Sequence, residues 1–171
     1  MAEIYKIGSD NIVDRVSTFG GTNLIKNSDI SQSVSNTTAN WAYATYHLVN
    51  PAGLKVGEQV TASADITPGS SDTWTAATFY LYNAASDDGA RGKSGTVLGN
   101  IVNGRASAVL TVNSNYTNYT DLLIYYGTAG STSGHSGTIT NVKLEKGNKP
   151  TDWTPAPQDL VKVSGTELQF Y

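Results

Sequence analysis

The sequence predicts an all-β protein, an antiparallel β-sandwich of the jelly-roll type with extended N- and C-terminal arms. Three observations predict this fold class. Apolar and polar residues alternate with a period of two, and Gly, Pro, Asn, Asp and Ser interrupt these runs about every ten residues. Ser, Thr, Asn and 17 Gly are abundant, and these residues favour strands and turns over helix interiors. A helical bundle is therefore excluded.

The length of 171 residues and 18.1 kDa fits one domain that is large enough to bury a substantial core. We divide the chain into an N-terminal arm or linker (1–22), a sandwich (23–159) and a C-terminal tail (160–171). The arm ends in two glycines, and a short helix within it needs another surface to pack on. The tail carries Leu168, Phe170 and Tyr171, so we expect both ends to pack on a neighbouring subunit or another protein.

Eight runs of alternation predict eight strands, which is the number in a jelly roll. Small apolar residues alternate with polar ones in two of these runs, so both are predicted to lie against the core. We expect Phe79, Leu81, Leu110, Ile124 and Leu144 to be buried together between two sheets. The predicted strands span residues 23–26, 41–49, 58–66, 74–83, 96–101, 105–112, 120–126 and 137–146.

Charge and cysteine content exclude several classes of function. The formal net charge is −3, and no basic stripe of the kind that neutralises phosphates is present, so nucleic-acid binding is disfavoured. Because there is no cysteine, no disulfide or thiolate metal site is predicted. The first residues lack the features of a signal peptide and no run of 18 apolar residues occurs, so we expect neither secretion nor membrane insertion.

Two motifs at the ends of the predicted sandwich resemble a known family. The chain reads NLIKNSDIS at residues 23–31 and VKLEKGNKPTDWTPAPQD at residues 142–159. This pairing resembles the carbohydrate-binding-module-like jelly rolls of tail fibre, baseplate and distal tail proteins in phages of Gram-positive bacteria. The closing motif is the more specific of the two.

The resemblance implies a galactose-binding-like sandwich that is non-catalytic and is displayed on the virion surface after synthesis in the host cytoplasm. Its implied partners are host cell-wall saccharide and other phage structural proteins, and such tail proteins are commonly homo-trimers. Related modules hold a calcium ion near the opening motif. Here a stretch rich in Ser, Asn and Thr follows Asp29-Ile30 in place of the usual pattern, so we predict no cofactor.

A saccharide site needs aromatic rings that stack on sugars and polar side chains that bond hydroxyl groups. Alternation places Trp41 and Tyr43 on one face with Thr45 and His47, and it separates Trp74, Tyr80 and Tyr82 from the core-facing side. A long loop rich in charge follows residue 83. The candidate saccharide-binding residues are Trp41, Tyr43, Trp74, Tyr80, Tyr82, Asp87, Asp88, Arg91 and Tyr125. Rings of this kind also fill cores and subunit interfaces.

Catalytic patterns are weak in this sequence. His47 and His135 are far apart and lack metal-ligand spacing, so each is expected to be a surface or packing residue. Carboxylate pairs such as Asp87-Asp88 lie in a solvated loop, which does not raise an acid's pKa. The sequence predicts a binding module and no enzyme. The alternative is a virion decoration or connector protein that makes only protein contacts, and Trp153 is predicted to be a structural plug.

Overall fold

The computed structural model describes residues 21–49, 52–83, 95–113, 119–164 and 167–170. Within these residues the protein is built from β-strands and one short 3₁₀ turn, η3 (Pro157–Asp159). The strands are β1 (Gln32–Val34), β2 (Tyr43–His47), β3 (Gln59–Pro68), β4 (Ala76–Tyr82), β5 (Val97–Val102), β6 (Arg105–Thr111), β7 (Asp121–Tyr125), β8 (Gly137–Lys146), β9 (Val161–Ser164) and β10 (Glu167–Phe170). None of the described helices is long and apolar enough to cross a membrane.

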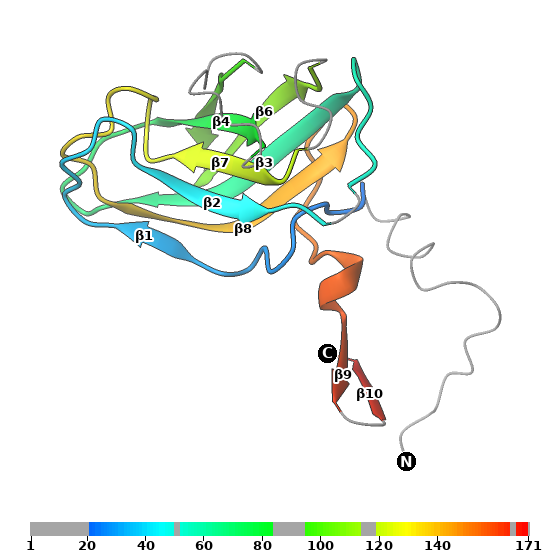
Figure 1. The fold of residues 1–171 in the computed structure, drawn as a ribbon. Coiled ribbons are helices and arrows are strands. Elements are labelled where there is room, and N and C mark those ends of the chain that lie inside the picture. The colour runs from blue at the N-terminus through cyan, green and yellow to red at the C-terminus, as the bar shows by residue number, and fades with distance from the viewer. Residues whose placement is uncertain (1–20, 50–51, 84–94, 114–118, 165–166, 171) are drawn as a thin grey trace.

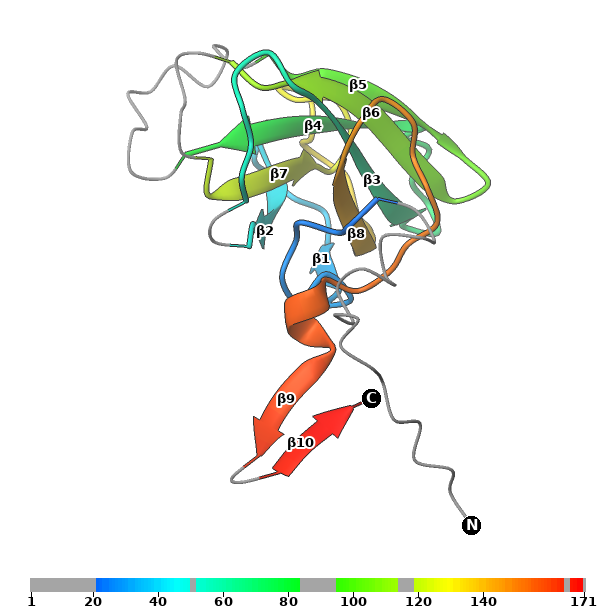
Figure 2. The same ribbon diagram turned by 90° about the vertical axis from the view of Figure 1, so that its right-hand side faces the viewer.

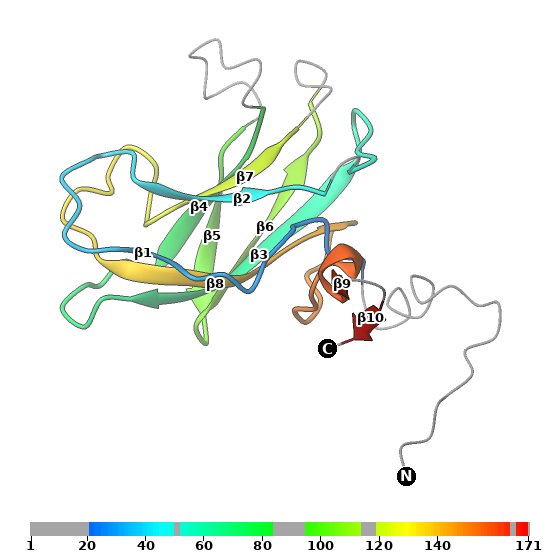
Figure 3. The same cartoon turned by 60° about the horizontal axis from the view of Figure 1, so that its bottom comes forward.

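Eight strands form one antiparallel sheet in the order β1-β8-β3-β6-β5-β4-β7-β2. The sheet folds over on itself, so that β2, β4 and β7 form one layer and β1, β3 and β8 form the other (Figures 1 and 3). The predicted all-β sandwich is confirmed. Seven of the eight predicted runs contain a strand, whereas residues 23–26 make only the isolated bridge Ile25↔Leu48.

Strand β1 is the one element of this sheet that the alternation did not predict. Its three residues, Gln-Ser-Val, lie in a stretch dominated by Ser, Asn and Thr. A run of three residues is too short for a period of two to stand out. Pairing with β8, in which Gln32 lies opposite Ile139, defines β1.

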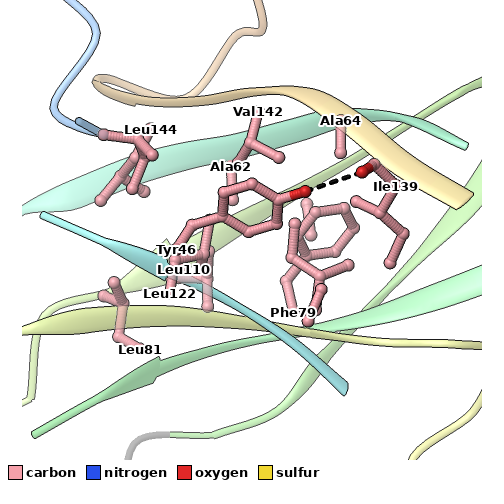
Figure 4. Close-up of a cluster of buried hydrophobic side chains, with 14 of the residues drawn as sticks. Tyr46, Ala62, Ala64, Phe79, Leu81, Leu110, Leu122, Ile139, Val142 and Leu144 are labelled. Carbon is pink, nitrogen blue, oxygen red and sulfur yellow. Dashed lines mark hydrogen bonds between the residues drawn. The ribbon is translucent and has the colours of Figure 1, made fainter. Parts of the chain in front are cut away.

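The core lies between the two layers, as Figure 4 shows. All five residues predicted to meet there belong to one buried cluster and are at most 1% exposed. Tyr46 from β2 reaches across this cluster, and its hydroxyl donates to the Ile139 carbonyl at 2.7 Å (Figure 4). Burial raises the pKa of the Tyr46 phenol well above its usual value, since the charged form would lose its water.

The sheet turns its corner at β5. The first four residues of β5 pair with β4 and its last two residues pair with β6. Gly99 lies opposite Ala77 of β4, close to this change of partner, and a Cβ there would come within 2.5 Å of the Ser107 carbonyl oxygen. Only glycine allows the two backbones to approach this closely. The β5–β6 hairpin then closes through Asn103 and Gly104, whose φ values of 51° and 79° suit a type I′ turn.

A side chain and a short backbone segment close the gap between the edge strands β1 and β2. The Gln32 amide donates to the Thr45 carbonyl at 2.5 Å and accepts from the Thr45 N–H at 3.1 Å. Further along, Lys26 N–H donates to the His47 carbonyl and Val49 N–H donates to the Leu24 carbonyl. Both edges of the sheet are thereby covered at these points, which limits pairing with other chains.

The opening and closing motifs of the sequence meet in space and form what we call the terminal clasp (Asn23, Ser28, Lys143, Glu145, Thr151, Trp153). Asn23 is fully buried. Its amide nitrogen donates to Ser28 Oγ, Val142 O and Thr154 O, and its oxygen accepts from the N–H groups of Ile25 and Leu144. The Trp153 indole donates to Ser28 Oγ at 3.1 Å, which agrees with its predicted role as a plug.

Two charged residues of β8 complete the clasp. Lys143 and Glu145 are 0% and 1% exposed, with Lys143 Nζ 3.6 Å from Glu145 Oε2. Thr151 joins them: its hydroxyl accepts from Lys143 Nζ and donates to Glu145 Oε2, each at 2.7 Å. Burial lowers the pKa of Lys143, an effect that the nearby Glu145 carboxylate opposes. Hydrogen bonds therefore accompany both buried charges.

The C-terminal tail contains structure that the sequence did not predict. Strands β9 and β10 form a separate two-stranded antiparallel sheet, which extends away from the sandwich (Figure 2). The described N-terminal end and this hairpin lie at the same end of the sandwich (Figure 1). The backbone N–H of Asn27 also donates to Asp159 Oδ2 at 2.8 Å, which ties the two ends together.

Candidate functional site

Four of the predicted site residues lie close together on the outer surface of β2, β7 and β4. The strand register sets Tyr43 opposite Tyr125, and Leu123 lies between Thr45 and Tyr80. Tyr80, Leu123 and Tyr125 form a small buried cluster separate from the main core, with Tyr82 against it. We call this surface, together with Trp41, the aromatic face (Trp41, Tyr43, Tyr80, Tyr82, Tyr125).

Two rings of the aromatic face are open to solvent. Trp41 is 53% exposed and Tyr43 is 36% exposed, whereas Tyr125 beneath them is completely buried. Tyr125 meets both rings edge to face, at centroid distances of 6.1 Å for Trp41 and 5.4 Å for Tyr43. Tyr80 and Tyr82 lie 6.2 Å apart on the neighbouring strand. The buried rings hold the exposed ones in fixed positions.

The loop that carries Trp41 is also fixed. The Thr132 hydroxyl accepts from the Ala42 N–H at 2.8 Å and donates to the Ala39 carbonyl at 2.6 Å. The Trp41 ring lies over Gly130, where an added Cβ would come within 3.3 Å of it. Because Gly130 has a φ of 85°, glycine suits both the backbone and the ring above it. Trp41 is therefore held in place before any ligand arrives.

Trp74 does not lie on the aromatic face, and its predicted outward position is wrong. It is 7% exposed and belongs to the main core. Its indole donates to the Ser136 carbonyl at 3.1 Å, and its ring meets Tyr126 edge to face. Strand β4 begins only at Ala76, so the alternation that orients Tyr80 and Tyr82 does not extend back to residue 74.

Asp87, Asp88 and Arg91, the predicted polar contributors, lie outside the described residues. The described part of the face has another polar group that was not among the predicted site residues. His47 Nδ1 lies 2.5 Å from Asp121 Oδ1, and Thr120 Oγ1 donates to Asp121 Oδ2 at 2.6 Å. The period of two already placed His47 with Trp41 and Tyr43, whereas its pairing with Asp121 depends on the register between β2 and β7.

The second histidine has a structural setting. His135 Nδ1 lies 2.9 Å from Asp72 Oδ1, and the Ser136 N–H donates to Asp72 Oδ2 at 2.6 Å. Burial raises the pKa of Asp72, but these hydrogen bonds outweigh it and the net shift is downward. The ring of His135 packs against Trp74. The contacts of Asp72 with His135 and Ser136 hold a loop in place at one end of the sandwich.

Acidic residues of the sheet are likewise engaged in structure. Asp65 accepts from Arg105 Nη1 at 2.6 Å and from the Asn141 amide at 2.8 Å. Among the described residues no group of three or more His, Asp or Glu side chains is placed to hold a metal ion.

The described surface thus defines a β-sandwich with a fixed row of aromatic rings on one outer layer. No protein-family model matches the sequence, and no curated protein matches it. A chain in the structure of the tripod (BppUct-A-L) from the baseplate of bacteriophage Tuc2009 is similar over 82% of this protein, with 14% sequence identity and a TM-score of 0.39. The match spans 60% of the phage chain.

Proposed function

We propose that this protein is a non-catalytic virion module of a phage, which binds host cell-wall saccharide through the aromatic face. The observation that carries the proposal is the exposed pair Trp41 and Tyr43, held edge to face over the buried ring of Tyr125. Exposed aromatic rings next to polar groups mark interaction sites on many proteins. The phage setting is supported by the opening and closing motifs of the sequence.

The physical chemistry of the face suits a saccharide. The apolar C–H surface of a sugar ring stacks on an aromatic ring, and such a contact loses little entropy when the ring is already fixed. Each hydroxyl contact replaces a contact with water and so adds little net free energy. We expect a dissociation constant in the millimolar to high micromolar range, equivalent to about 4–6 kcal/mol. Many copies on one virion would then supply the attachment strength.

The experiment is calorimetry with cell-wall polysaccharide purified from Gram-positive bacteria. Trp41→Ala and Tyr43→Ala should each weaken binding about tenfold or more, since each removes a stacking surface. Val102→Ala is the matched control, because Val102 is 65% exposed and lies outside the aromatic face. Circular dichroism verifies folding. Unchanged affinity in both folded ring variants, or no binding by the parent protein at millimolar saccharide, would contradict the proposal.

A second candidate function has its own observation. Leu98, Val102 and Val109 are 52%, 65% and 36% exposed on β5 and β6, where they support a contact with another virion protein or with a second copy of this chain. A decoration or connector protein needs only such contacts. Leu98→Asp should abolish incorporation into particles under this hypothesis, whereas the saccharide-binding module would retain binding in solution.

A further inference from the structure

We propose that His47 determines specificity at one end of the aromatic face, by accepting a hydrogen bond from a saccharide hydroxyl group. Asp121 is its positioning residue. This inference rests on the proposed function and concerns the same surface. It identifies the ligand as a chain of at least two sugar units, with a free hydroxyl on the unit that lies over His47.

The position of His47 follows from the strand geometry. His47 and Tyr43 belong to β2 and lie on the same face of the sheet, four residues apart, which corresponds to about 13 Å along the strand. The His47 side chain is 71% exposed. A ligand that covers both Tyr43 and His47 is longer than one sugar ring. The spacing of Tyr43 and His47 therefore favours an oligosaccharide that lies along β2.

Asp121 fixes the hydrogen-bonding character of the imidazole. Its carboxylate can only accept, so the short 2.5 Å contact places a hydrogen on His47 Nδ1. In the neutral ring Nε2 then carries a lone pair and acts as an acceptor. His47 Nε2 makes no hydrogen bond within the part of the chain that the structure describes. It is available to the hydroxyl of a ligand.

The carboxylate that orients His47 is itself held firmly. Asp121 is 4% exposed, and its second oxygen accepts from the Thr120 hydroxyl at 2.6 Å. Asp121 also lies between His47 and Tyr82 in the strand register. Stacking on aromatic rings alone leaves a ligand free to slide along the surface. A firmly held polar group beside the rings fixes the orientation of the ligand.

The test uses soluble oligosaccharides released by mild acid hydrolysis of the same cell-wall polysaccharide and separated by length. The full-length protein should bind chains of two or more units more tightly than single sugars. His47→Ala should weaken binding of the longer chains about tenfold without changing the affinity for single sugars. His47→Gln should restore part of the loss, because its amide oxygen can accept from the same hydroxyl.

Asp121→Ala separates positioning from simple structural support. It should weaken binding as much as His47→Ala does, and the double variant should show no further loss. The ¹⁵N chemical shifts of the His47 imidazole should report a hydrogen on Nδ1 in the parent and a mixture of tautomers in Asp121→Ala. Circular dichroism verifies that each variant is folded.

Outcomes for the two proposals can be told apart with Trp41→Ala measured beside His47→Ala. If Trp41→Ala abolishes binding and His47→Ala leaves the affinity for long chains unchanged, the role of His47 is overturned while the saccharide site stands. If the parent protein binds neither single sugars nor longer chains, both proposals are overturned. Equal binding of single sugars and long chains by the parent also overturns the role of His47.

Discussion

Asn23 shows at the level of one residue why the two terminal motifs occur together. Its side chain makes hydrogen bonds to the opening segment, to β8 and to the part of the closing motif that follows β8. A shorter or purely apolar side chain would leave several buried backbone groups without partners. The two motifs are far apart in the sequence, but in the structure they meet around this one buried amide.

Replacing this amide should be severely destabilising. Asn23→Ala should lower the free energy of unfolding by about 3 kcal/mol or more, because several buried donors and acceptors lose their partner at once. Asn23→Asp should also destabilise, since a carboxylate cannot donate to Val142 O and Thr154 O. Urea denaturation measures both effects. Asn148→Ala, at an exposed position, should change stability by less than about 0.5 kcal/mol, and an equally small change in Asn23→Ala would contradict this role.

Among the elements, the edge strands β1 and β2 are joined without a backbone ladder. Neighbouring strands elsewhere pair by backbone ladders, such as the seven residue pairs between β3 and β6. Where β1 meets β2, one hydrogen bond donated by the Gln32 amide and one accepted by it, both with the Thr45 backbone, replace a ladder. The amide acts as one strand residue would, since it presents a donor and an acceptor side by side.

Removing the Gln32 amide should open this joint without unfolding the sandwich. Gln32→Ala should lower stability by about 1–2 kcal/mol and should speed hydrogen exchange of the Thr45 amide proton. Gln32→Glu should have a similar effect, because it cannot donate to the Thr45 carbonyl. Exchange measured by NMR tests both variants. Ser33→Ala, at the adjacent exposed position, should leave the Thr45 exchange rate near that of the parent, and unchanged exchange in Gln32→Ala would show that the joint is closed by other contacts.

The accuracy of the sequence predictions differs between elements for physical reasons. Alternation predicted seven strands and the shared burial of Phe79, Leu81 and Leu110, because successive side chains of a strand point to opposite faces and a period of two therefore shows which residues face the core. It misplaced Trp74, which precedes β4 and so follows no alternation. Alternation does not reveal β1, because three residues carry too little pattern, nor the hairpin of β9 and β10, whose strands have only four residues each.

The candidate site was predictable only in part. The spacing predicts that Trp41, Tyr43, Tyr80, Tyr82 and Tyr125 share one outward surface, and the structure brings them together. The predicted exposure of Tyr80 and Tyr125 is wrong, because these two rings are 1% and 0% exposed. Which rings are exposed depends on how the sheet stacks Tyr125 beneath its neighbours, and sequence spacing does not encode this. The partnership of His47 with Asp121 requires the register between β2 and β7, which two distant segments do not reveal. Both features arise from tertiary structure.

Considered as a whole molecule, the sandwich should lose stability in alkaline solution through its buried tyrosines. Burial raises the pKa of Tyr126 to about 12 and that of Tyr46 further still. In the unfolded chain a tyrosine titrates near 10. From about pH 10 upward the unfolded state therefore binds fewer protons than the folded state, and the free energy of unfolding falls as the pH rises.

Urea denaturation at pH 8, 10 and 11 measures this effect. The contribution of these phenols should be fully present below about pH 10 and should decline progressively towards pH 12. Tyr126→Phe should show a shallower decline between pH 10 and 11 than the parent, because one titrating group is absent. Leu98→Ala, a non-titrating surface substitution, should keep the slope of the parent. A parent whose stability is flat over this range would contradict the burial of these phenols.

The terminal clasp determines how the molecule responds when its two ends are pulled apart. The first described segment and β8 run antiparallel, joined by hydrogen bonds of 2.8 Å from Leu24 N to Leu144 O and from Val142 N to Ser28 O. The chain that follows β8 folds back over this pair before it leaves the sandwich: Thr154 O accepts from the Asn23 amide at 2.9 Å, and Asp159 Oδ2 accepts from the Asn27 N–H at 2.8 Å. Tension on the two ends would therefore load these contacts of the closing motif first. The hydrogen bonds to β8, and the core behind them, would carry force only after those contacts had broken.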